Sequence, residues 1–273
     1  MFSFLKNISW RAWRVWQRNF DVYLVTWKVN FIPPLLEPLL YLFAFGFGLG
    51  GFIKNVPYGG TQISYLKFIA PGLIATAIMN HGFFETTYAS YVRMYFQKTF
   101  DAILSTPLTI EDVVLGEVIW GATKAFFAGV IMLVVTALFG LLIWPQSLWI
   151  LPIALVGGMC FSSMGMCFTA LVKNIEMFNF PVFLFVTPMF LFSGVFFPLA
   201  ALPPWAQGVA WCLPLTFLVS TLRALALGVI HSSLFAEIFI LAAASVICTF
   251  FSIVFMKKRL VKRSEERRVG KEC

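Results

Sequence analysis

The chain has 273 residues, of which 60% are hydrophobic and only 12% charged, and its mean hydropathy is +0.88. A soluble fold would expose much of this apolar surface to water, so the composition excludes a soluble globular protein and indicates an integral membrane protein. The net charge of +8 does not indicate a nucleic-acid partner, because the basic residues cluster at the chain ends beside apolar segments, as in membrane proteins.

Residues 4–28 predict an amphipathic helix lying in the membrane surface. Trp10, Trp13 and Trp16 alternate with Arg11 and Arg14 in this stretch. Tryptophan prefers the membrane interface and arginine pairs with lipid phosphates. A basic and aromatic stretch can also bind RNA, but an apolar run follows directly, which favours the membrane interpretation.

The apolar runs predict six transmembrane helices, each long enough for a hydrocarbon core of about 30 Å. Their expected bounds are 31–52, 65–88, 113–144, 148–172, 178–197 and 233–255. An even number of crossings places both termini on the same side, and the basic residues after the sixth span predict that this side is the cytoplasm. The fold class is therefore an all-α polytopic membrane protein. The polar tail at 263–273 differs abruptly in composition and resembles the non-native tails of unrelated translated sequences.

Prolines break the region 198–229 into short pieces. Pro198, Pro203, Pro204 and Pro214 are joined there by Gly208. Unpaired backbone is tolerated in a membrane only where it is buried in protein or lines a cavity. The pattern predicts broken, re-entrant helices before the last span.

Five ionisable residues within the expected spans are candidates for function, because such groups are costly in a bilayer and face protein or water. They are Glu37, His81, Glu85, Glu117 and Lys124. His81 and Glu85 could supply two metal ligands, but no third is evident, so we expect no metal site. Lys124 could pair with Glu37 or Glu117, or extend to the interface. A structural role for these residues stays open beside a functional one.

The longest polar interlude, Tyr91 to Glu117, predicts a short surface helix between two spans. Its apolar and polar residues recur at helical spacing on two faces, and Pro107 ends the helix. Thr109 and Asp112 then form the start signal of the next helix.

The chain carries no sequence signal for an ATPase or another catalytic centre. Gly116 and Gly121 have the spacing of a phosphate-binding loop, but Ala122 stands before Thr123 where Lys is required. We expect no catalytic residues, and energy for any transport must come from another chain.

Four stretches together resemble one family. They are EPLLYLFAFGFGLG from Glu37, YLKFIAPGLIATAIM from Tyr65, FDAILSTPLTIEDVVLGEVIWGATKA from Phe100 and FNFPVFLFVTPMFLFSGVFFPLAALPPWAQ from Phe178. Over residues 1–262 the chain resembles the permease subunits of ABC-2 type exporters, and within them the nodulation-factor, or lipo-oligosaccharide, exporter permeases.

The resemblance implies a bacterial inner-membrane exporter built from two permeases, expected to be a homodimer, and two separate ABC ATP-binding subunits. ATP and Mg²⁺ would bind those subunits, and this chain would bind no cofactor. The substrate would be amphipathic, such as a lipo-oligosaccharide or lipid-linked glycan. A drug exporter permease is the alternative, and an intramembrane enzyme acting on lipid-linked substrates is a weaker one.

The resemblance also implies roles for particular residues. Residues 93–106 would be a cytoplasmic coupling helix, docking through the exposed side chains of Phe96, Phe100 and Leu104, with Arg93 and Asp101 at the rim. An alternative is that Phe96 and Phe100 rest on the bilayer surface. The exit or gate region would comprise Ser193, Gly194, Pro203, Pro204, Trp205 and Arg223.

Overall fold

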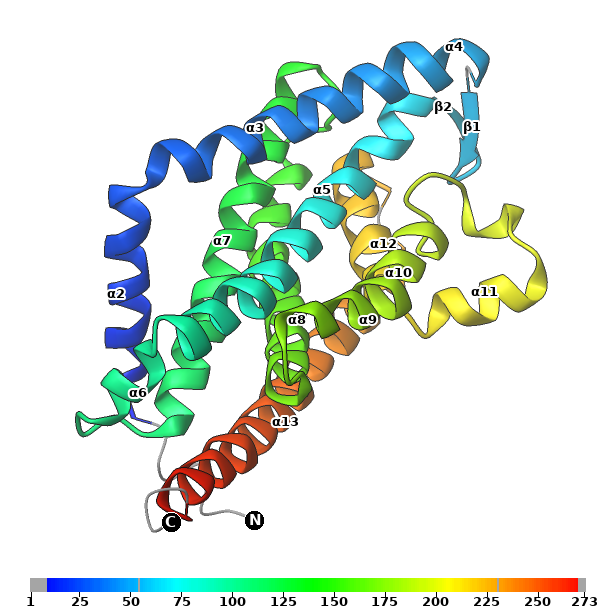
Figure 1. The fold of residues 1–273 in the computed structure, drawn as a ribbon. Coiled ribbons are helices and arrows are strands. Elements are labelled where there is room, and N and C mark those ends of the chain that lie inside the picture. Colours follow the sequence, from blue (N-terminus) through cyan, green and yellow to red (C-terminus); the bar gives the residue numbers. More distant parts are fainter. Residues whose placement is uncertain (1–8, 54, 230, 270–273) are drawn as a thin grey trace.

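The computed structural model describes residues 9–53, 55–229 and 231–269, which form a mostly helical bundle with one small hairpin (Figure 1). The N-terminal half comprises α2 (Ala12–Val25), α3 (Trp27–Phe43), η1 (Ala44–Leu49), α4 (Gly50–Phe52), β1 (Asn55–Tyr58), β2 (Thr61–Ser64), α5 (Tyr65–Phe84), η2 (Glu85–Ala89), η3 (Val92–Phe96), α6 (Thr99–Leu104) and α7 (Ile110–Leu138). The C-terminal half comprises η4 (Gln146–Trp149), α8 (Ile150–Leu171), η5 (Ile175–Phe178), α9 (Asn179–Pro181), η6 (Val182–Val186), α10 (Thr187–Phe192), η7 (Leu199–Ala201), α11 (Pro204–Trp211), α12 (Pro214–Leu227) and α13 (Leu234–Val269).

Within the described residues, four helical segments are long and apolar enough to cross a membrane. They are Ile110–Leu138, Gln146–Leu171, Ile175–Phe192 and Leu234–Val261. A fifth is obtained if α11 and α12, which are bent by 88° at their junction, count as one span. An all-α polytopic membrane protein is therefore confirmed, whereas six spans and the cytoplasmic side of the termini stay predictions.

The first two expected spans are helical but less uniformly apolar. The helix through 31–52 has its apolar part at Pro34–Gly46, and α5 carries Lys67, Asn80 and His81. Most of the α5 side chains are buried within the protein itself. This helix therefore contacts protein along much of its length, so it need not be apolar all round.

Two expected spans end earlier than predicted, each near a glycine. α7 ends at Leu138 rather than 144, and Gly140 follows with a φ of +67°. α10 ends at Phe192 rather than 197, and Gly194 has a φ of +72°. Glycine adopts this left-handed conformation readily and thereby ends the helix. In contrast, α13 continues past 255 through Val269, so residues 263–269 of the expected polar tail are helical, and 270–273 lie outside the described residues.

The helix expected over 4–28 is present as α2 (Ala12–Val25) and ends earlier than predicted, because the chain bends at Thr26 between α2 and α3 (Figure 1). Its position in the membrane surface stays a prediction. Thr26 has φ −103° and ψ 16°, outside the helical region, and its hydroxyl donates to the carbonyl of Val22. α2 then packs along α7, burying Ala12 and Val15. Residues 4–8 lie outside the described residues.

The connection between the first two expected spans forms a β-hairpin. β1 and β2 pair antiparallel from Asn55↔Ser64 to Tyr58↔Thr61. Gly59 and Gly60 form the turn, with φ of +59° and +79°. Positive φ at both central residues is what a two-residue hairpin turn of type I′ requires, so the Gly-Gly pair was the available sequence signal.

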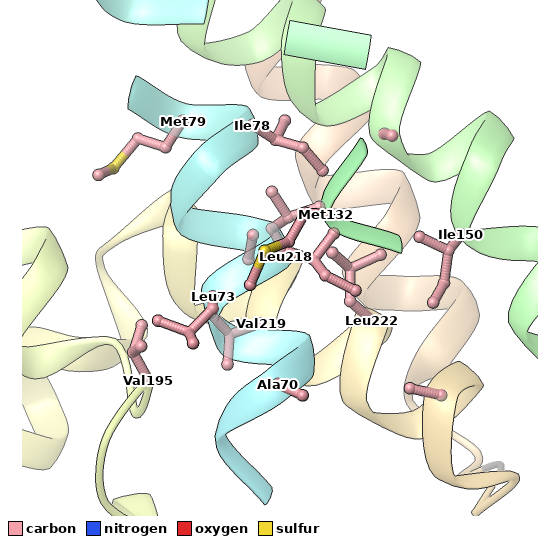
Figure 2. Close-up of a cluster of buried hydrophobic side chains, with 14 of the residues drawn as sticks. Ala70, Leu73, Ile78, Met79, Met132, Ile150, Val195, Leu218, Val219 and Leu222 are labelled. Atoms are coloured by element: carbon pink, nitrogen blue, oxygen red, sulfur yellow. The ribbon is translucent and has the colours of Figure 1, made fainter. Parts of the chain in front are cut away.

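The buried apolar side chains form two clusters. The larger lies between α5, α7, α8 and α12, where Leu73, Ile78, Met132 and Leu218 meet (Figure 2). The smaller cluster includes Met94, Phe100 and Val113, near the start of α7. Figure 1 shows the start of α2, α6 and the end of α13 at one end of the molecule, here called the α6 end, and the hairpin at the other, the hairpin end.

Candidate functional site

The expected coupling helix over 93–106 is two pieces rather than one. η2 and η3 extend α5 to Phe96, and α6 starts again at Thr99. Between them Lys98 has φ 52° and ψ 26°, a left-handed conformation that interrupts the helix. We call residues 92–104 the coupling segment. The next helix, α7, starts at the predicted signal. The Thr109 hydroxyl accepts a hydrogen bond from the Asp112 amide, and the Asp112 carboxylate accepts one from the Thr109 amide.

This break separates the two phenylalanines that were expected on one docking face. Phe96 is 61% exposed, and Tyr95 beside it is 45% exposed. Phe100 is 0% exposed and belongs to the smaller apolar cluster, so its expected exposure is wrong. Leu104 is half-buried against the same cluster, and Asp101 is half-buried on α6. The accessible aromatic surface of the segment is thus at its first half.

Arg93 was expected at the exposed rim of the docking surface, but it lies in a buried charge network. Its Nη1 donates to Glu85 Oε1 at 2.8 Å. Its Nη2 and Nε donate to Glu117 Oε2 at 2.6 and 3.1 Å. Arg93 faces inward because η3 continues the α5 helix, placing it on the same face as Glu85, eight residues earlier and about two turns away.

Lys124 completes the charged part of this network. Its Nζ donates to Glu85 Oε2 at 2.8 Å and lies 3.3 Å from Asn30 Oδ1. Lys124 therefore pairs with Glu85 and not with Glu37 or Glu117, the two partners that the sequence suggested. The buried charge network, as defined here, comprises Glu85, Arg93, Glu117 and Lys124.

Neutral side chains donate further hydrogen bonds to the two carboxylates. Asn19 on α2 donates to Glu117 Oε1 at 2.9 Å, and Ser90 donates to Glu117 Oε2. Trp120 Nε1 donates to Glu85 Oε1 at 2.8 Å. These three residues were missed from the sequence. Only Asn19 had a usable signal, because it follows Ala12 and Val15 at helical spacing and so belongs to the buried face of α2.

The network balances two carboxylates against two cations, which is the condition for burying charge at low cost. Burial alone would lower the pKa of Arg93, but the charges of Glu117 and Glu85 outweigh it and raise the pKa. The guanidinium therefore stays charged and fixed. Through its contacts the network connects the coupling segment to α2, to the end of α5 and to the first half of α7.

His81 and Glu37 form a separate, looser pair. His81 Nε2 lies 3.8 Å from Glu37 Oε2, and both side chains are partly exposed. Over the described ranges of the chain, no three His, Cys, Asp or Glu side chains are placed together to hold a metal ion. Of the five expected intramembrane candidates, Glu85, Glu117 and Lys124 come together and Glu37 with His81 lies beside them.

At the hairpin end, the expected gate residues are partly brought together by Arg223. Its Nε donates to Phe68 O at 3.1 Å and its Nη2 to Gly194 O at 2.8 Å, and its guanidinium lies 3.8 Å from the centroid of the Phe68 ring. Ser193 is buried next to this contact.

The other gate residues belong to α11. Pro203 and Pro204 form the start of α11, and exposed Trp205 lies edge-on to Phe192. The broken helices expected from the prolines are present as α11 and α12. Their re-entrant placement and a gating role stay predictions.

The comparison with known families agrees with this architecture. The model of the ABC-2 type transporter family matches residues 11–227, which includes the coupling segment, the charge network and both broken helices. The chain belongs to the ABC-2 type transporter family.

Individual relatives cover nearly the whole chain. It is 37% identical over 255 residues to Nodulation protein J of Rhizobium meliloti (strain 1021), covering 93% of this chain and 95% of the relative. It is likewise 37% identical over 256 residues to Nodulation protein J of Rhizobium leguminosarum bv. trifolii, covering 94% and 95%. Similarity to the inner membrane transport permease YadH of Escherichia coli (strain K12) is 23% over 226 residues, covering 82% and 86%.

These findings make the chain a multi-pass permease subunit of an ABC exporter in the bacterial inner membrane. It is a transporter subunit and not an enzyme, so the alternative of an intramembrane enzyme is excluded. Membership of the family also implies an ABC ATP-binding partner in general terms.

Proposed function

We propose that two copies of this chain and two separate ATP-binding subunits form an exporter that moves an amphipathic substrate, such as a lipo-oligosaccharide or a lipid-linked glycan, out of the cytoplasm. ATP and Mg²⁺ bind the partner subunits. Likeness to Nodulation protein J over nearly the full chain supports this substrate class above a drug.

The observation that carries the coupling proposal is an exposed pair of aromatic side chains beside an arginine that two carboxylates hold in place. Tyr95 and Phe96 are exposed, while Arg93, three residues before Phe96, is held by Glu85 and Glu117. Aromatic side chains that are rigidly presented are the usual anchors of protein interfaces. We assign Phe96 as the main docking residue, and Leu104 and Asp101 as its neighbours at the edge of the contact.

Transmission follows from the same geometry. Closure of the ATP-binding subunits on ATP displaces the coupling segment, and ATP can shift the equilibrium only by its differential affinity for the two states. Arg93 then carries the displacement to Glu117 on α7 and Glu85 at the end of α5. The broken helices α11 and α12 form or gate the exit.

The test is co-purification of the permease with a candidate ATP-binding subunit from the same genome. Phe96→Asp should weaken association roughly 30-fold, the equivalent of about 2 kcal/mol for an anchor residue. The matched control is Phe197→Asp, which alters another exposed phenylalanine outside the coupling segment and should leave the complex intact.

Phe100→Asp is unsuitable as a docking test because Phe100 is buried, and the substitution would unfold the protein locally. Full ATPase association of Phe96→Asp, with an unchanged melting temperature, would contradict the assignment of Phe96. Failure of the wild-type permease to associate with any ATP-binding subunit would contradict the proposed function itself.

A further inference from the structure

A cavity of about 400 Å³ with polar and aromatic residues in its wall lies beside the buried charge network, between α3, α5 and α7. Its wall includes Glu37, Asn80, His81 and Lys124, and the rings of Phe84 and Tyr88. The volume falls within the usual range of small-ligand sites, about 300–1,000 Å³.

The polar groups of this wall are available for a ligand. The side chains of Glu37 and His81 are 32% and 25% exposed, and their 3.8 Å separation leaves the pair loosely joined. Asn80 is half-buried, and its amide has no hydrogen bond to any side chain or backbone group that the structure describes. Polar groups within membrane helices face water or protein rather than lipid, so we expect the cavity to open onto an aqueous path.

We propose that this cavity binds a neutral sugar unit of the exported substrate. The inference rests on the proposed function and specifies which part of the substrate this chain recognises. A sugar hydroxyl both donates and accepts hydrogen bonds, which matches a wall that combines the Glu37 carboxylate, the Asn80 amide and the His81 imidazole.

The aromatic residues supply the second half of the match. The Phe84 and Tyr88 ring centroids are 5.9 Å apart with an interplanar angle of 33°, and both rings line the cavity. Aromatic rings offer apolar faces to the C–H groups of a sugar, whereas the Tyr88 hydroxyl remains a polar group at the ring edge.

Charge excludes the main competing ligands. In the wall, Glu85 and Lys124 pair with each other at 2.8 Å. A phosphate or carboxylate would therefore meet the remaining carboxylate, Glu37, which repels it. A neutral polyol requires no charge partner and is therefore the best match.

The cavity and the charge network share Glu85 and Lys124. A sugar that forms a hydrogen bond with Glu85 or Lys124 would weaken the ion pair between these two residues. Glu85 also contacts Arg93 at 2.8 Å. Occupancy is thereby linked to the coupling segment through two contacts. Bound sugar should raise the ATPase activity of the assembled transporter, an effect that a purely structural cavity would not produce.

The direct test uses the permease in lipid nanodiscs with maltotetraose as a neutral probe, measured by saturation-transfer-difference NMR against empty nanodiscs. We expect transfer to the sugar C–H protons. Asn80→Ala and Glu37→Gln should each weaken binding about fivefold, corresponding to the loss of one hydrogen bond. Gln62→Ala, an exposed amide on β2, is the matched control and should bind like wild type.

Three results would overturn the inference: no transfer in the wild type, equal transfer in Asn80→Ala and Gln62→Ala, or stronger transfer to an acidic oligogalacturonate than to maltotetraose. If Glu37→Gln does not fold, Asn80→Ala alone decides. ATPase association is scored on the same preparations. If the ATP-binding subunit associates but the sugar does not bind, only this inference is overturned. If the ATP-binding subunit does not associate, the proposed function is overturned, and sugar binding can still be measured separately.

Discussion

Each end of the molecule holds an arginine in its interior, but the groups that contact the two guanidinium ions differ. At the α6 end, Arg93 contacts two carboxylates, and Glu117 is itself 0% exposed. At the hairpin end, Arg223 contacts the backbone carbonyls of Phe68 and Gly194 and the face of the Phe68 ring.

The difference reflects what each arginine holds. Arg93 connects the carboxylate of Glu85, at the end of α5, to that of Glu117 on α7, so it links the movement of these two helices. Arg223 donates to the carbonyl of Phe68 within α5 and to that of Gly194, where the chain has just left α10. It thereby attaches this non-helical segment to α5. The first is suited to transmitting a displacement, and the second to fixing an irregular segment.

The largest effect is expected from Arg93→Leu. Removal of the guanidinium leaves two buried carboxylates and one ammonium, so the site carries an unbalanced charge. Breaking a buried pair in this way costs about 3–5 kcal/mol. The melting temperature of the purified permease should fall accordingly.

The double variant Arg93→Leu with Glu117→Gln is the control for this effect, because it removes one of the stranded charges. It should be more stable than Arg93→Leu alone. If both variants melt together with the wild type, the network contributes nothing and the contrast between the two ends disappears.

A smaller loss, about 1–3 kcal/mol, is expected from Arg223→Met. The carbonyl oxygens left behind are neutral, so their cost is lower than that of an unpaired carboxylate. Hydrogen exchange should rise in the segment that follows Gly194 while α7 remains protected. Arg223→Lys, which keeps the charge but forms fewer directed hydrogen bonds, should be intermediate. A loss larger than that of Arg93→Leu would reverse the proposed order.

Gly116→Ala tests the contact of α2 with α7 next to the network. A β-carbon at Gly116 would lie 2.6 Å from Val15 Cβ and 2.8 Å from the Ala12 carbonyl oxygen, so α2 must shift. Such overpacking costs about 1–3 kcal/mol. Because Asn19 on α2 bonds Glu117, the shift should also weaken the coupling of ATPase activity to substrate, measured in the assembled transporter. Unchanged melting temperature and coupling would show that α2 can adjust freely.

The smallest effect, of opposite sign, is expected at the hairpin end. A β-carbon at Gly208, inside α11, would meet nothing within 4 Å. Gly208→Ala should therefore stabilise α11 by up to about 1 kcal/mol through helix propensity. A small rise in melting temperature is the expected result, and a fall would mean that this glycine is packed against a partner in the assembled transporter.

Local signals in the sequence were sufficient for several features. Composition identified the membrane protein, Thr109 with Asp112 identified the start of α7, and the prolines after Pro198 identified the broken helices α11 and α12. None of these features requires knowledge of which helices pack together. The four quoted stretches were likewise enough to recognise the family that the comparisons show.

Other features were decided only by how the helices pack. Glu117 accepts a hydrogen bond from Asn19, which lies 98 residues earlier in the chain. Lys124 pairs with Glu85 rather than with Glu37 or Glu117. Phe100 turns inward because Lys98 breaks the segment and redirects α6. A sequence pattern gives the faces of one helix, but which face meets which helix, and which charges then pair, is set by the simultaneous burial of all of them in the folded protein.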